Sequence, residues 1–173
     1  MTKHPRVALL MGSSSDLDTV RPALDTLDGL GVPYQVQVAS AHRTPEAVIT
    51  FAKSAARRGI RVIIAAAGGA AHLPGGVAAH TNVPVIGLPV ATQPLQGMDA
   101  LLSMVQMPKG VPVAVVGVNA AANAALLAAQ ILALGDRRLA EALKRRRAAQ
   151  KSAVRQQNSR VRKQLAQKPK GAA

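Results

Sequence analysis

The chain has 173 residues, of which 49% are hydrophobic and 1% aromatic, and it contains no cysteine. A chain of this length forms one ordinary domain, and this composition makes its core aliphatic. The lack of cysteine excludes a disulfide framework, a thiolate nucleophile and a cysteine-based zinc site, and the scarcity of aromatic residues argues against nucleic-acid binding by base stacking.

The net charge of +14 is divided unevenly along the chain. Residues 1–135 carry nine Lys or Arg and six acids, a net charge of +3, whereas residues 136–173 carry thirteen and two, a net charge of +11. The N-terminal segment lacks the apolar core of a signal peptide, and no apolar run reaches the roughly 18 residues of a membrane helix. We therefore expect a soluble, cytoplasmic protein with a globular domain over 1–135 and a C-terminal helix and basic tail over 136–173.

Apolar segments of strand length alternate with segments of helix length along the whole chain. Predicted strands cover residues 7–11, 34–39, 62–66, 83–88 and 113–118. Predicted helices cover residues 16–30, 45–58, 73–80, 99–105, 120–134 and 136–170. Several strands are near-continuous apolar runs, which is typical of parallel strands covered on both faces. The pattern predicts an α/β fold, a three-layer αβα sandwich with right-handed crossovers.

The last two predicted helices differ sharply in character. Residues 120–134 are apolar nearly all round, which predicts a helix buried on more than one side and, in so small a domain, a homo-oligomer. Residues 136–170 are basic with a thin apolar stripe of Leu139, Leu143 and Val154. This segment is either a charged helix that extends over a neighbouring subunit or into solvent, or an electrostatic anchor for nucleic acid.

Three short motifs follow the first three predicted strands. The sequence SAHRTP at residues 40–45 places a titratable ring, His42, beside the fixed cation Arg43 at a helix start. The sequence GSSSD at residues 12–16 offers hydroxyls and a helix N-terminus, which favour an anion such as phosphate. Serine and aspartate in this position also act as simple helix caps.

The third motif, GGAAHLPGG at residues 68–76, has small residues that leave room for a flat ligand. A tight strand-to-helix turn would explain its glycines but not His72. Residues 89–97 follow the fourth strand and are long enough to form a wall or lid. Ligands of open parallel sheets bind outside the carboxyl ends of the strands, where all of these segments lie.

Other site chemistries fit the sequence poorly. The chain shows no P-loop, no three-glycine dinucleotide fingerprint and no nucleophile elbow. Its acids are too scattered for a carboxylate pair, and its histidines lack metal-ligand spacing.

Together, these motifs, with VQMP at residues 105–108 and NAALLAAQIL at residues 123–132, closely resemble one family over about residues 6–145. It is the class I N5-carboxyaminoimidazole ribonucleotide mutase family of de novo purine (IMP) biosynthesis, also called the phosphoribosylaminoimidazole carboxylase catalytic subunit. The AAHLPG segment is similar to class I rather than to the class II enzyme, which uses carbon dioxide directly. Residues 116–120 lack the GKAG form of many members, and the tail beyond about residue 150 has no family counterpart.

The resemblance implies a flavodoxin-like fold, a homo-octamer, no metal or organic cofactor, and an isomerase that moves a carboxylate from the exocyclic nitrogen to a ring carbon. It implies that His42 is the general acid/base, that Ser13 and Arg43 lie near the phosphate of the ribonucleotide, and that Asp16 lies near the ribose. The residues expected to line the base and carboxylate pocket are Ser40, Ala41, Gly68, Ala70, Ala71, His72 and Leu73.

The sequence is also compatible with three other functions. A class II carboxylase would share the fold and the product. A phosphate-ligand-binding module without catalysis would leave His42 unexplained. Nucleic-acid contact through the basic tail would be compatible with enzyme activity and would depend steeply on salt.

Overall fold

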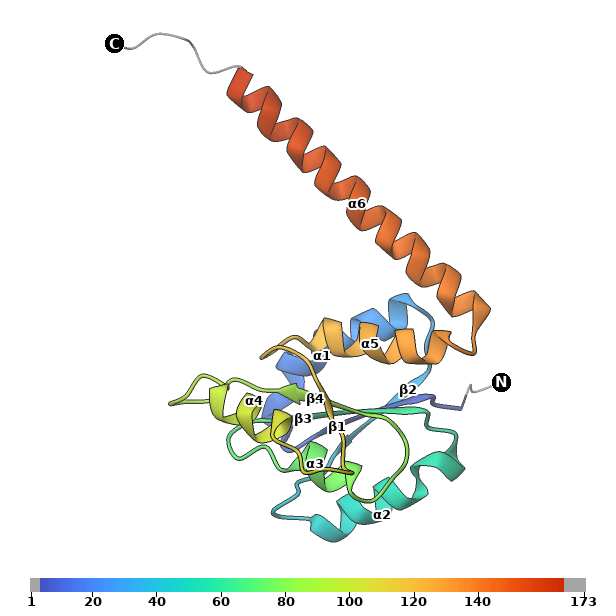
Figure 1. Ribbon diagram of the computed structural model, residues 1–173, viewed down its shortest axis with the longest axis vertical. Helices are drawn as coiled ribbons and strands as arrows, with labels where there is room; N and C mark the ends of the chain where they lie inside the picture. Colours follow the sequence, from blue (N-terminus) through green and yellow to red (C-terminus); the bar gives the residue numbers. More distant parts are fainter. Residues whose placement is uncertain (1–3, 167–173) are drawn as a thin grey trace.

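Five parallel strands form one sheet in the spatial order β2-β1-β3-β4-β5 (Figure 1). The computed structural model describes residues 4–166. The strands are β1 (Val7–Met11), β2 (Tyr34–Val38), β3 (Val62–Ala67), β4 (Val85–Pro89) and β5 (Ala114–Val115). Because every pairing is parallel, the carboxyl ends of all the strands lie at the same edge of the sheet.

Helices cover both faces of this sheet, which confirms the predicted three-layer αβα sandwich (Figure 1). α1 and α5 pack on one face, and α2, α3 and α4 on the other. The helical segments are η1 (Ser14–Asp16), α1 (Leu17–Gly29), α2 (Pro45–Ala55), η2 (Ala56–Arg58), α3 (Leu73–Ala78), α4 (Met98–Val105), α5 (Ala121–Ala133) and α6 (Arg137–Ala166).

Each central strand supplies side chains to two hydrophobic cores. Leu9 and Ile64 belong to the core under α1 and α5, whereas Leu10 and Ile63 belong to the core under α2 and α3. Successive side chains of a strand point to opposite faces, so a strand covered on both faces must be apolar throughout. This explains why β1, β3 and β4 are buried along their full length.

The last two strands differ from the predicted ranges. β4 begins at Val85 rather than at residue 83, because Pro84 has no N–H to donate to the ladder. β5 has only two residues instead of six. Beyond it the chain keeps only separate bonds to β4, from the Val116 N–H to the Gly87 carbonyl at 3.1 Å and from the Asn119 N–H to the Pro89 carbonyl at 2.8 Å.

The apolar helix α5 is covered largely within its own chain. Ala124, Ala125 and Ala128 of this helix are fully buried, and α5 packs closely along α1 and over β3 and β4. Small side chains allow this close approach of two helices. Intramolecular packing therefore accounts for much of the apolar character from which the sequence predicted a subunit contact.

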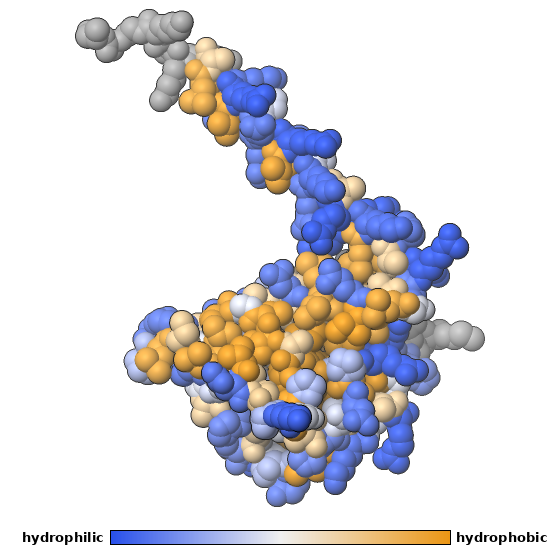
Figure 2. All heavy atoms as spheres, viewed as in Figure 1, coloured by the Kyte–Doolittle hydropathy of each residue, from blue (hydrophilic) through white to orange (hydrophobic). Residues whose placement is uncertain are grey.

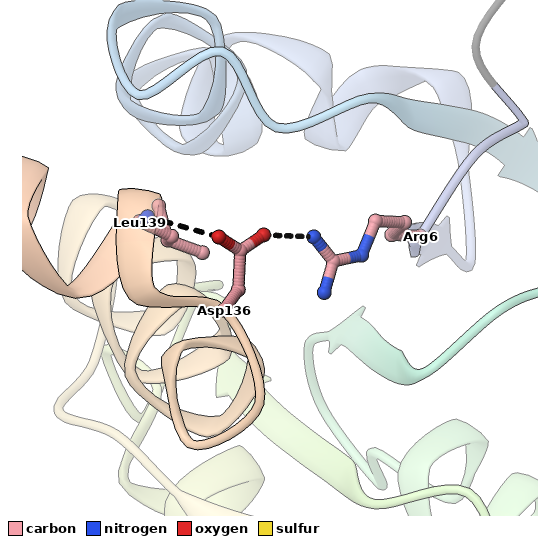
Figure 3. A network of polar contacts seen from close by, with 3 residues as sticks. All are labelled: Arg6, Asp136 and Leu139. Carbon is pink, nitrogen blue, oxygen red and sulfur yellow. Dashed lines mark hydrogen bonds and ion pairs between the residues drawn. The ribbon is translucent and has the colours of Figure 1, made fainter.

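The final helix, α6, is anchored to the body at its first turn (Figure 3). The Arg6 guanidinium donates to the Asp136 carboxylate at 2.6 Å, and the other Asp136 oxygen accepts from the Leu139 N–H at 3.1 Å. Leu139 is buried and Leu143 half-buried, but from Lys144 onward every described residue is exposed. α6 stands away from the body (Figure 1) and remains helical to Ala166; residues 167–170 of the predicted helix lie outside the described residues.

None of the helices within residues 4–166 combines the length and the apolarity needed to cross a membrane.

Candidate active site

The loops that follow β1, β2, β3 and β4 enclose a cleft of about 380 Å³ at the carboxyl edge of the sheet. This is the edge where ligands of open parallel sheets bind. The residues that line it are Gly12, Ser13, Ser15, Asp16, Ser40, Ala41, His42, Arg43, Ala67, Gly68, Ala71, His72, Leu73 and Thr92. Ten of the eleven expected site residues therefore meet in one cleft; the eleventh, Ala70, is exposed and does not line it.

The loop after β1 is organised by a capping box between Ser13 and Asp16. The Ser13 hydroxyl oxygen accepts the Ser15 N–H at 3.3 Å and the Ser15 hydroxyl at 2.8 Å, while the Ser13 N–H donates to the Asp16 carboxylate at 3.3 Å. Burial raises the pKa of the Asp16 carboxyl above its ordinary value of 3.8, although the Ser13 N–H, the Ser15 hydroxyl and the charge of Arg43 act in the opposite direction. The cap thus holds a partly desolvated carboxylate at the rim of the cleft.

The loop after β2 is closed by Ser40 and Thr44. The Thr44 hydroxyl oxygen accepts the Ser40 N–H at 2.9 Å, and the Ser40 hydroxyl oxygen accepts the Arg43 N–H at 3.2 Å. Thr44 occupies the N-cap position of α2, but its side chain makes no hydrogen bond to the amides of that helix. The Thr44 hydroxyl therefore closes the loop and does not cap the helix.

Arg43 joins the loop after β2 to the end of β1. Its Nη2 donates to the Gly12 carbonyl at 2.8 Å, and its Nε lies 3.4 Å from the Ser40 hydroxyl oxygen. These contacts use two of the five guanidinium N–H groups, so the others remain for a ligand. The side chain holds a fixed positive charge at the mouth of the cleft, beside the Asp16 carboxylate.

His42 and His72 lie in contact across the cleft. His42 Nε2 is 2.6 Å from His72 Nδ1, and the two rings meet edge to face with centroids 4.7 Å apart. One of these nitrogens must carry a hydrogen and the other a lone pair, because a hydrogen bond needs a donor and an acceptor. The sequence predicted both residues in one pocket but gave no sign that they would pair.

Gly68 is required by the close approach of the loop after β4. A Cβ at this position would lie 2.6 Å from Thr92 Cγ2 and 3.2 Å from the Val90 carbonyl oxygen. Thr92 therefore packs directly over Gly68 and forms one wall of the cleft. The sequence indicated residues 89–97 as a wall but did not single out Thr92; its position just beyond a central strand is the signal that could have done so.

Among the residues that the structure describes, no three His, Asp or Glu side chains gather as they would around a metal ion. The polar groups of the cleft are hydroxyls, backbone amides, one carboxylate, one guanidinium and two imidazoles. This set can bind an anion and transfer a proton. The fold is that of a doubly wound α/β protein, and its cleft contains groups that suit a small anionic molecule.

Comparison with known proteins shows to which family this α/β protein belongs. The model of the AIR carboxylase family matches residues 6–153. N5-carboxyaminoimidazole ribonucleotide mutase of Bacillus subtilis is 56% identical over 153 residues, which cover 87% of this chain and 94% of that protein. The protein of the same name from Saccharolobus solfataricus is 53% identical over 141 residues, which cover 82% and 89%. The chain belongs to the AIR carboxylase family.

A solved structure agrees with this assignment. The crystal structure of Treponema denticola PurE superposes with a TM-score of 0.83 at 31% identity, and the match covers 91% of this chain and 98% of that one. The family model ends at residue 153, whereas α6 continues to Ala166.

Proposed function

We propose that this protein is an N5-carboxyaminoimidazole ribonucleotide mutase that transfers a carboxylate from the exocyclic nitrogen of its substrate to a ring carbon. The observation that carries the proposal is the cleft itself, which brings together paired imidazoles, a fixed cation and a capped helix start. Relatives that are more than half identical over most of this chain are named for this reaction.

Binding is assigned to the groups at the ends of β1 and β2. Ser13 and Arg43 hold the phosphate, because a guanidinium and a hydroxyl at a helix start favour an anion. Asp16 accepts a hydrogen bond from a ribose hydroxyl. The base lies against Ser40, Ala41, Gly68, Ala71, His72 and Leu73. Ala70 is not assigned to this pocket, because it does not line the cleft.

Catalysis is assigned to His42. In the first step the bond between nitrogen and carboxylate breaks, which releases carbon dioxide while the nitrogen takes a proton. In the second step the ring carbon forms a bond to that carbon dioxide and loses its own proton. The two steps consume no net proton, so one imidazole that gives and then takes a proton serves both.

His72 has a positioning role in this scheme. A ring nitrogen at 2.6 Å decides which nitrogen of His42 carries the hydrogen and restrains the orientation of its ring. Small apolar residues on the cleft wall, among them Ala41, Ala67 and Ala71, limit the water around the carbon dioxide. Free labelled carbon dioxide should therefore exchange little into the product during turnover.

An ultraviolet assay with purified protein tests the function directly. Conversion of the carboxyamino ribonucleotide without added bicarbonate is expected. Product from aminoimidazole ribonucleotide and bicarbonate alone would instead identify a class II carboxylase. Binding of the ribonucleotide without turnover of either substrate would indicate a binding module and would contradict the proposal.

We propose further that the protein assembles as a homo-octamer and acts in the cytoplasm. Figure 2 shows a broad apolar area over the body on the side of α4 and α5. Leu95, Met98, Leu102 and Val105 are each at least half exposed, and together they form an apolar surface that a second copy of the chain would cover. A monomer in light scattering at micromolar concentration would contradict the assembly, and cell fractionation tests the location.

A further inference from the structure

The outer part of α6 is a long, isolated element that the family model does not include in full. α6 has 30 residues and extends 13 residues beyond residue 153, where the family match ends. At 1.5 Å per residue, α6 is about 45 Å long. Every residue from 144 to 166 is exposed, and Figure 1 shows this part of the helix standing clear of the body. The sandwich therefore does not need the outer part of α6 for its own core.

This segment carries an uncompensated positive charge. Residues 144–166 contain nine Lys or Arg and no acid. Lys144 pairs with Glu141 at 2.7 Å, and no other cation of the segment has an ion-pair partner within residues 4–166. Like charges along one helix repel each other, so the charge does not serve the stability of α6. The positive charge of the segment is complementary to the negative charge of a polyanionic partner.

The cations have a regular arrangement along α6. Lys144, Lys151, Arg155 and Arg162 follow one another at intervals of seven, four and seven residues, which places them along one side of the helix. From the first to the last of them this side extends about 27 Å. An α-helix of this diameter fits the major groove of a nucleic-acid duplex such as B-DNA, whose strands present closely spaced phosphates.

We propose that α6 beyond Leu143 binds double-stranded nucleic acid through the phosphate backbone, without sequence preference. The segment has no aromatic side chain for stacking on unpaired bases, so a single strand gains little from it. Phosphate contacts alone carry no sequence information. This activity is separate from the reaction in the cleft, and neither depends on the other.

Two other partners fit the segment less well. An anionic membrane would need a continuous apolar side, but Arg147, Gln150 and Gln157 interrupt the side that carries Leu143, Val154 and Val161. The same helix of a second copy would meet it with like charge along its whole length, and the body of a second copy, residues 1–135, also has a positive net charge, +3. Of these partners, the phosphates of a nucleic-acid duplex are therefore the best match for the positive charges of the segment.

The test is carried out with the full-length protein and a charge-removing variant. The variant combines Lys151→Gln, Arg155→Gln, Arg160→Gln, Arg162→Gln and Lys163→Gln, and glutamine keeps the helix because its helix propensity is close to that of lysine and arginine. A matched control replaces five uncharged, exposed residues of the same segment by alanine: Gln150, Ser152, Gln156, Gln157 and Asn158. Circular dichroism checks that helix content is unchanged in both variants.

Binding is measured by the fluorescence anisotropy of a labelled 24-base-pair DNA duplex between about 50 and 200 mM salt. For the wild type and the control, the logarithm of the binding constant should fall linearly with the logarithm of salt concentration. The charge-removing variant should bind at least about tenfold more weakly, and its slope should be less steep by about 0.9 for each phosphate that the helix no longer neutralises. Turnover of the carboxyamino ribonucleotide should be the same for all three proteins.

A second variant, truncated after Ala153, removes the part beyond the family match and should weaken duplex binding in the same direction. Equal duplex affinity for the control and the charge-removing variant would overturn the proposal. So would binding to vesicles that contain phosphatidylserine without binding to the duplex. A change in oligomeric state on charge removal, seen by sedimentation velocity, would also overturn it, because the cations would then lie in a subunit contact.

Discussion

His42 Nε2 and His72 Nδ1, which belong to the loops after β2 and β3, lie 2.6 Å apart. The two residues are 30 positions apart in the chain, and their strands are not neighbours, because β1 lies between β2 and β3. The contact joins the two loops across the end of β1, close to the capped helix start that follows it. In the proposed reaction this hydrogen bond sets the proton position of the residue that carries the chemistry.

Replacement of His42 by asparagine should lower turnover by about two to four orders of magnitude, the usual contribution of general acid–base catalysis. The side chain is exposed, so the midpoint of thermal unfolding should stay nearly constant. The ultraviolet assay and a thermal melt measure the two quantities. His4→Asn, a change in an exposed histidine outside the cleft, is the control. Near-normal turnover would remove His42 from its proposed role.

Two substitutions of His72 should show whether this residue orients the His42 ring through a hydrogen bond or only fills space beside it. His72→Ala removes the hydrogen bond, and the removal should lower kcat by about ten- to a hundredfold with little change in KM. His72→Asn places an amide near the position of Nδ1 and should recover most of that activity. If the asparagine variant were as slow as the alanine variant, the 2.6 Å contact would not explain the role of His72.

Arg43→Ala should raise KM by about ten- to a hundredfold, because it removes a charge-assisted hydrogen bond to a phosphate. The hydrogen bonds of Arg43 to the Gly12 carbonyl and the Ser40 hydroxyl lie at the surface, so stability should change little. Steady-state kinetics and a urea titration measure the two effects. A large loss of stability with an unchanged KM would show that Arg43 serves only to join the loops.

Gly68→Ala should destabilise the protein by about 1–3 kcal/mol, the usual cost of overpacking. The new Cβ would lie 2.6 Å from Thr92 Cγ2. Thr92→Ala should recover part of the stability when it is combined with Gly68→Ala, and urea denaturation of the single and double variants measures this coupling. Additive effects of the two substitutions would mean that Thr92 is not the residue that excludes a side chain at position 68.

Asp16 should make stability depend on pH in the acid range. Its pKa is raised by burial, so the folded protein holds the proton more tightly than the unfolded chain does. Protonation of Asp16 therefore stabilises the folded protein. This contribution is complete at a pH below the ordinary pKa of 3.8 and is lost as the pH rises through the raised pKa of the folded state. Relative to Asp16→Asn, the wild type should therefore lose stability as pH rises through this range. Urea denaturation at a series of pH values measures the difference, and a constant difference would contradict the assignment.

Much of the fold could be predicted from local sequence. Residues 62–66 are apolar without alternation because β3 is covered on both faces, and residue types reveal that condition directly. The motifs after the first three strands were predicted to share a site because parallel strands bring their carboxyl ends to one edge. The predictions were less accurate where pairing partners decide the outcome, as in β5, whose length depends on the β4 residues beside it.

The sequence by itself determined the αβα class, the family and the set of chemical groups at the cleft, because those depend on residue types and their order. Only the tertiary structure decided that His42 would meet His72, that Arg43 would bond to the Gly12 carbonyl, and that Thr92 would require a glycine at position 68. Each of these contacts joins loops whose separation is set by strand order and register. Strand order and register arise from the packing of the whole sheet, and no local pattern of residues encodes them.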